Sequence, residues 1–177
     1  MRRAVKRIVS IILIAATAAT AVASVGLLVP SRVGASVSLT KIERQVLDCV
    51  NQKRARHGLT RVRAQADLMS AARAHSRDMA HRSFFAHTSA LGQTYVQRVI
   101  DFGYGNTGWA RWTVGENIYN GRARTLMASA QVAVLRWMSN PIHRRVLLGS
   151  AYRDAGIGVH GDGGKRYFTL DLGRRVR

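Results

Sequence analysis

The sequence predicts an α+β domain in which about four helices flank a small antiparallel sheet, within a chain of 177 residues. Apolar residues recur at helical spacing from residue 40 to residue 148, whereas the tail holds two strand-like segments, 156–159 and 167–171. Between them, Gly161-Asp162-Gly163-Gly164 is a strong hairpin signal, because glycine reaches the positive φ angles of tight turns. The length suits one domain rather than two large ones.

The first two helices have clear boundaries. Thr40-Lys41-Ile42-Glu43 is a capping box, in which the Thr hydroxyl and the Glu carboxylate each accept an N–H of the first turn. We expect this helix to end at His57-Gly58, where glycine supplies a left-handed residue. A short extended piece, 60–63, precedes a second helix that begins near Ala66. Its apolar stripe consists of Leu68, Ala71, Ala72, His75 and Met79.

The central part of the chain predicts three further elements and a loop. A third helix is expected over 93–102, with Val96, Val99 and Ile100 facing inward. The following segment, 103–115, is rich in Gly, Asn and Trp and predicts a loop. A fourth helix is expected at about 125–140, and a short turn over 141–148 follows, with Asn140 at the N-cap and Pro141 at the first helical position.

The N-terminus is typical of a secretory signal peptide. Residues 1–7 carry four cations and no acid, residues 8–28 are uncharged and apolar or small, and small-x-small sites lie at 21–23 and 33–35. We therefore expect a signal peptide over 1–23, with cleavage as late as 35, and a linker over 24–38. An uncleaved membrane anchor is the alternative, and both place the rest of the chain outside the cytoplasm.

The chain is strongly basic, with a formal net charge of +19, which becomes +15 without the four cations of residues 1–7. Such a charge favours anionic partners, and outside the cell these are lipid or acidic envelope polymers rather than a specific nucleic acid. The arginines are scattered, so a solvated basic surface is the alternative. Cys49 is alone, so no internal disulfide is expected and the core must supply the stability.

Two segments hold candidate chemistry: His87 after the aromatic pair Phe84-Phe85, and Glu116 between Gly115 and Asn117. Spacing alone predicts no known reaction. His87 has no His-Glu-x-x-His pattern, no serine lies in a nucleophile elbow, and there is no phosphate-binding glycine loop.

Six short motifs follow one another in a single order. They are Ala74-His75-Ser76-x-Asp78-Met79, Phe84-Phe85-x-His87-Thr88, Gly115-Glu116-Asn117-Ile118, Trp137-Met138-x-x-Pro141-x-His143-Arg144, Gly156-x-Gly158-Val159 and Asp171-x-Gly173. Together they resemble the bacterial branch of the CAP superfamily, also called SCP-like extracellular proteins or the cysteine-rich secretory protein, antigen 5 and pathogenesis-related family. The resemblance covers residues 39–173 as one domain and leaves 174–177 as a basic tail.

The resemblance implies an α-β-α sandwich with a three- or four-stranded antiparallel sheet and a cavity lined by two histidines and two acids. Carried over to this chain, the cavity residues are His87, Glu116 and His143, with Asn117, Tyr119 and Trp137 as further lining. The second acid of the eukaryotic members falls on Leu135, so one acid is missing here, as are the family's disulfides. His75 and Asp78 are expected to be structural.

The trio His87, Glu116 and His143 leaves three functions open. It could bind a ligand, or Zn²⁺ or another divalent metal with both histidines and Glu116 as ligands. It could also act as the centre of a metal-assisted hydrolase on peptide or envelope material, although no nucleophile is evident. Finally, it could be a vestigial polar network in a structural domain of the envelope. A protein partner at the envelope is a further alternative, no cofactor other than such a metal is expected, and we expect a monomer.

Overall fold

The computed structural model describes residues 37–123, 125–162 and 164–177, which form five helices and four strands. The helices are α1 (Lys41–Arg56), α2 (Ala66–His81), α3 (Tyr95–Asp101), α4 (Leu126–Ser139) and α5 (Pro141–Leu147). The strands are β1 (Arg63–Ala64), β2 (Arg111–Arg122), β3 (Asp154–Asp162) and β4 (Lys165–Val176). The predicted signal peptide and residues 24–36 of the predicted linker lie outside the described residues.

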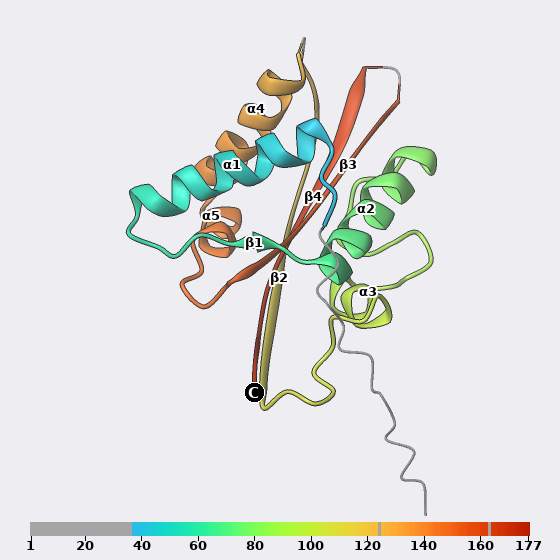
Figure 1. Cartoon of the computed structure of the whole chain (residues 1–177). Helices are drawn as coiled ribbons and strands as arrows, with labels where there is room; N and C mark the ends of the chain where they lie inside the picture. The colour runs from blue at the N-terminus through green and yellow to red at the C-terminus, as the bar shows by residue number, and fades with distance from the viewer. Residues whose placement is uncertain (1–36, 124, 163) are drawn as a thin grey trace, which may run out of the picture. The chain divides into compact units, whose positions relative to one another are not determined.

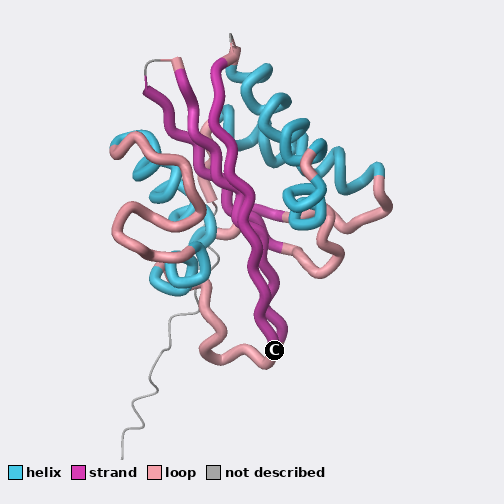
Figure 2. The backbone as a smooth tube through the Cα atoms, turned by 180° about the vertical axis from the view of Figure 1, so that it is seen from behind, coloured by secondary structure: helices cyan, strands magenta, loops and turns pink. Residues whose placement is uncertain are grey.

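The sheet lies between two layers of helices, with α1, α4 and α5 on one side and α2 and α3 on the other (Figures 1 and 2). The strand order is β1-β3-β4-β2. β2 and β4 pair antiparallel over their whole length, whereas the short β1 pairs parallel with β3. The predicted α+β sandwich is confirmed, and the sheet is mixed rather than wholly antiparallel.

The local signals of the helices explain their boundaries. The capping box of α1 forms in both directions, with Thr40 N–H donating to Glu43 and Glu43 N–H donating to Thr40. Asn140 accepts two backbone N–H groups at the start of α5, with Pro141 at the first position. α3 is shorter than the predicted helix. It also buries a different face, since Ile100, which was expected to face inward, is 39% exposed while Arg98 is buried.

Two hydrophobic layers cover the two faces of the sheet. The main core joins residues of α1, α4 and the sheet, with Val46, Val50, Trp137, Phe168 and Leu170 among its fully buried members. A smaller cluster around Leu68, Val99 and Tyr104 lies on the side of α2 and α3. Cys49 is half-buried beside the main core.

Two glycines of β3 let α2 pack directly on the sheet. A Cβ added at Gly156 would lie 2.1 Å from the carbonyl oxygen of Leu68, and one at Gly158 would lie 2.0 Å from that of Ala72. Both contacts are with helix backbone, which no side-chain rotation can relieve. The Gly156-x-Gly158 motif is therefore a packing requirement that fixes where α2 lies.

Three expectations change. Residues 111–115, predicted as loop, begin β2, because Trp112, Thr113 and Val114 pair with the far end of β4. The expected basic tail also belongs to the sheet, since β4 continues to Val176. Finally, the arginines are not all a solvated surface.

Arg54 shows this most clearly, because its guanidinium is buried. It donates to the backbone carbonyls of Thr60, Leu147, Gly149 and Tyr152 and so ties α1 to the end of α5 and the loop that follows it.

Within the described part of the chain, no helix combines the length and apolar character that crossing a bilayer requires.

Candidate functional site

The candidate site is built on β2, which is an edge strand of the sheet. Glu116 lies in the middle of β2, opposite Asp171 of β4, and its side chain is 0% exposed. Because β2 has a neighbour on one side only, groups from the loop after α2 and from α5 can approach the strand from its open edge. The loop after α2 therefore reaches Glu116, and α5 reaches the neighbouring Asn117.

The carboxylate of Glu116 is held from two directions. His87 Nδ1 lies 2.7 Å from Oε1, and Arg98 of α3 makes a short contact with Oε2 through Nη2. The Arg98 side chain is 3% exposed, so the ion pair is buried. A carboxylate paired with a guanidinium is a hydrogen-bond acceptor, so Nδ1 of His87 carries a proton, and in the neutral ring Nε2 is the nitrogen with a free lone pair.

His75 helps to position His87. It is buried in α2, and its Nε2 lies 2.9 Å from the carbonyl oxygen of Ala86. Burial lowers the pKa of His75, although the carboxylate of Glu116 opposes this effect. The neutral ring therefore donates its Nε2–H to Ala86 and fixes the loop immediately before His87.

His143 approaches the same place from α5. Its ring centroid lies 6.4 Å from that of His87, and Asn117 of β2 donates from Nδ2 to the His143 carbonyl at 2.9 Å. Burial, and then the neighbouring His87, lower the pKa of His143, so the neutral imidazole is favoured. The His87 side chain is 45% exposed, so this pair of rings faces solvent in front of the buried Glu116.

Asp171 places a second carboxyl beside Glu116. It is buried, and neither of its oxygens accepts a hydrogen bond from a group within the described ranges. Burial and the Glu116 carboxylate raise the pKa of Asp171 well above its ordinary value, against the opposing effect of Arg98. Asp171 is therefore favoured as the protonated acid, which can donate a hydrogen bond to Glu116.

Several residues expected near the site lie elsewhere. Tyr119 and Trp137 belong to the core instead of lining a cavity: the Tyr119 ring lies 5.8 Å from that of Phe168, and Trp137 Nε1–H donates to the Ile118 carbonyl at 2.9 Å. Asp78, which was expected to be structural, forms a partly exposed ion pair with Arg82 at 2.8 Å.

Leu135, which occupies the position of the missing acid, is 52% exposed on α4. The second carboxyl near Glu116 comes from Asp171 instead.

The arrangement limits how a metal ion would be held. Among the described residues, no three His, Cys, Asp or Glu side chains are placed together as a ligand set. The rings of His87 and His143 lie 6.4 Å apart, with their planes tilted by 55°, and could supply two nitrogen ligands. Glu116 lies behind His87 and accepts its Nδ1–H, which is the position of the outer carboxylate that orients a metal-binding histidine. The residues thus fit a two-imidazole site, with Glu116 in support rather than as a ligand.

Sequence reasoning missed Arg98 and the role of Asp171. The signal for Arg98 was indirect: an acid in an apolar strand needs a cation to compensate its burial, and α3 offers one arginine. Asp171 stands between Leu170 and Leu172, so the strand context already indicated a buried acid.

The fold and the site define a CAP, or SCP-like, domain: a three-layer sandwich in which one histidine from the loop after α2 and one from α5 lie beside a glutamate of the sheet. The profile of the Cysteine-rich secretory protein family, CAP, matches residues 47–172, and the chain belongs to this family.

Two curated relatives come from Bacillus subtilis. The uncharacterized membrane protein YlbC is 30% identical over 137 residues, which cover 77% of this chain and 35% of YlbC. The uncharacterized protein YkwD is 27% identical over 121 residues, which cover 68% of this chain and 43% of YkwD. The chain thus spans less than half the length of either relative.

Two solved structures have a similar fold. An extracellular SCP-domain protein from Bacillus anthracis superposes with a TM-score of 0.61 and 26% identity, over 77% of this chain and 44% of that one. An outer surface protein from Borrelia burgdorferi superposes with a TM-score of 0.66 and 15% identity, over 78% of this chain and 96% of that one, which shows a common fold.

Proposed function

We propose that this chain is an exported bacterial CAP module that binds a ligand at the paired imidazoles of His87 and His143. The observation that carries the proposal is the series of contacts that runs from the buried Arg98 through the buried Glu116 to the partly exposed His87. It fixes the His87 ring so that Nδ1–H points inward and Nε2 remains available beside His143. The basic composition and the leader support an envelope location.

The ligand class follows from the two rings. Neutral imidazole nitrogens suit a borderline divalent ion such as Zn²⁺, and the pKa of His143 is held low, which keeps that ring neutral and able to coordinate. With two protein nitrogens, a bound ion would keep open positions for water or for an anionic group of a further ligand. The ion would supply a positive charge at the surface where that group binds.

The test is a Zn²⁺ titration of the full chain by calorimetry. We expect saturable binding near one equivalent, and loss of that binding in His87→Ala/His143→Ala. A second exposed pair, His81 and His160, with Nε2 atoms 3.1 Å apart, provides the matched control. If His81→Ala/His160→Ala removes the binding and the first variant keeps it, the assignment to His87 and His143 is wrong.

A metal-assisted hydrolase is the second candidate, and one observation favours it. A histidine whose Nδ1–H donates to a buried carboxylate can act as a general base through Nε2. Glu116→Gln keeps the size of the side chain and weakens that base. An unchanged rate of peptide or envelope hydrolysis in this variant, in a protein of wild-type fold, would exclude the catalytic role.

A further inference from the structure

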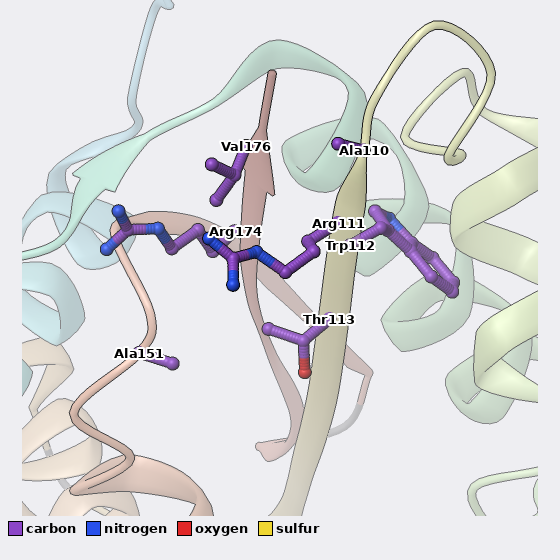
Figure 3. Close-up of a pocket in the computed structure, with 7 residues that line it drawn as sticks. All are labelled: Ala110, Arg111, Trp112, Thr113, Ala151, Arg174 and Val176. Atoms are coloured by element: carbon purple, nitrogen blue, oxygen red, sulfur yellow. The ribbon is translucent and has the colours of Figure 1, made fainter.

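A groove lies on the sheet away from the histidines, at the start of β2 and the end of β4 (Figure 3). Its volume is about 570 Å³. The lining residues are Ala110, Arg111, Trp112, Thr113, Ala151, Arg174 and Val176. We call it the arginine groove.

The strand register places both arginines on one face. Arg111 pairs with Val176, and Thr113 pairs with Arg174. Paired residues of an antiparallel ladder point to the same side, and residues two apart along a strand do so as well. Arg111 and Arg174 are therefore diagonal neighbours on the groove side. Figure 3 shows both side chains extended in the same direction, away from the Trp112 ring.

Nothing in the described residues neutralises these two charges. Neither Arg111 nor Arg174 makes an ion pair or a side-chain hydrogen bond there, and no acid lines the groove. The adjacent Arg175, which points to the other face, is fully partnered: it lies 3.7 Å from Asp67 and stacks over Tyr104 and Trp109. The groove side of the ladder thus holds two like charges without a counter-charge.

The wall of the groove is held rigidly. Ala151 lies in the loop after α5. The buried Arg54 donates hydrogen bonds to the carbonyl of Leu147 at the end of α5 and to those of Gly149 and Tyr152 in the loop. Arg153 also donates to the carbonyls of this loop. A preorganised wall lowers the entropy that binding would cost.

A second basic hollow lies along α5 and the start of this loop. It has a volume of about 500 Å³ and is lined by Pro141, Arg144, Arg145, Leu148 and Gly149. Arg144 and Arg145 likewise make no side-chain hydrogen bond or ion pair within the described part of the chain. Four uncompensated guanidinium groups therefore border one short loop, which suits a ligand with repeated negative charges.

The aromatic residue of the groove argues against a nucleic acid. Single-stranded nucleic acids bind on aromatic rings that stack with bases. The Trp112 ring instead points to the opposite side of β2, where its Nε1–H donates to the Tyr104 carbonyl at 2.8 Å. A concave site without a large apolar side chain at its rim also lacks the anchors by which proteins insert into a bilayer.

We propose that the arginine groove binds a linear phosphodiester polymer of the cell envelope, with Arg111 and Arg174 each pairing with backbone phosphate oxygens. Guanidinium forks match phosphate geometry, because their N–H donors can pair with two phosphate oxygens at once. This inference goes beyond the proposed function, because it requires neither His87 nor His143.

The experiment measures binding of the full chain to fluorescent poly(glycerol phosphate) at several salt concentrations. Arg111→Gln/Arg174→Gln is compared with Arg44→Gln/Arg77→Gln, which removes the same charge from two exposed arginines of α1 and α2 that pair with no acid of the described chain. We expect at least a tenfold loss of affinity at about 150 mM salt in the groove variant and less than threefold in the control. The slope of log affinity against log salt concentration should also become less steep by about one to two, because the variant releases one to two fewer counterions on binding.

Three results would overturn the proposal. Equal losses in the two arginine variants would show that diffuse charge binds the polymer. Groove-dependent binding to vesicles of phosphatidylcholine and phosphatidylglycerol at 3:1, without polymer binding, would identify a membrane surface instead. Loss of polymer binding in His87→Ala/His143→Ala would move the polymer to the histidine site, whereas wild-type binding there supports the groove.

Discussion

Replacing Arg98 by Met should strongly destabilise the domain. The Arg98 side chain is 3% exposed and that of Glu116 0% exposed, so removing the guanidinium leaves a buried carboxylate whose remaining partner is His87, with the Asp171 carboxyl beside it. Breaking such a pair from one side costs about 3–5 kcal/mol of unfolding free energy. In a domain of this size that corresponds to a fall in Tm of roughly 10 °C.

The measurement is urea unfolding followed by tryptophan fluorescence, with Arg77→Met as the control. Arg77 is an exposed arginine of α2, and its replacement should change the free energy by less than about 0.5 kcal/mol. The double variant Arg98→Met/Glu116→Gln should be less destabilised than the sum of the two single variants, because it leaves no buried charge.

An Arg98→Met loss below about 1 kcal/mol would refute the reasoning. It would mean that water screens the pair and that Arg98 does not hold Glu116 in place. The orientation of His87 would then need another cause.

Three further predictions concern packing and pH. Gly158→Ala should lower the free energy of unfolding in urea by about 3 kcal/mol, since the new Cβ would lie 2.0 Å from the backbone of α2. Gly105→Ala is the control and should cost little, because no atom lies nearer than 3.8 Å to its Cβ. Similar losses in the two variants would contradict the packing argument. Because the pKa of Asp171 is raised, the folded state keeps a proton that the unfolded chain has lost, so the free energy of unfolding should fall as the pH rises above about 4. Asp171→Asn should make this fall less steep. An unchanged dependence of stability on pH would show that Asp171 is not protonated beside Glu116. The pKa of His143 is lowered, so stability should instead be lost as the pH drops below about 6.5, and an NMR titration midpoint above that value would contradict the burial argument.

The sequence determined those features that depend on near neighbours in the chain. The Thr40 capping box, Asn140 with Pro141, and the glycines of the hairpin indicated where helices and turns begin and end, because caps and turns are made within a few residues. The ordered motifs also indicated the family and named His87, Glu116 and His143, which the structure brings to one place.

Only the tertiary structure decided which side chains complete the site and where the uncompensated charge lies. Arg98 is one of many arginines in the sequence, and it becomes a partner of Glu116 because α3 packs near β2 on the face of the sheet that α2 covers. Residues 111–115 looked like a loop, and pairing with β4 made them a strand with Arg111 and Arg174 on one face. Burial and strand register depend on residues distant in the chain, and these set the protonation of Asp171, the orientation of His87 and the composition of the arginine groove.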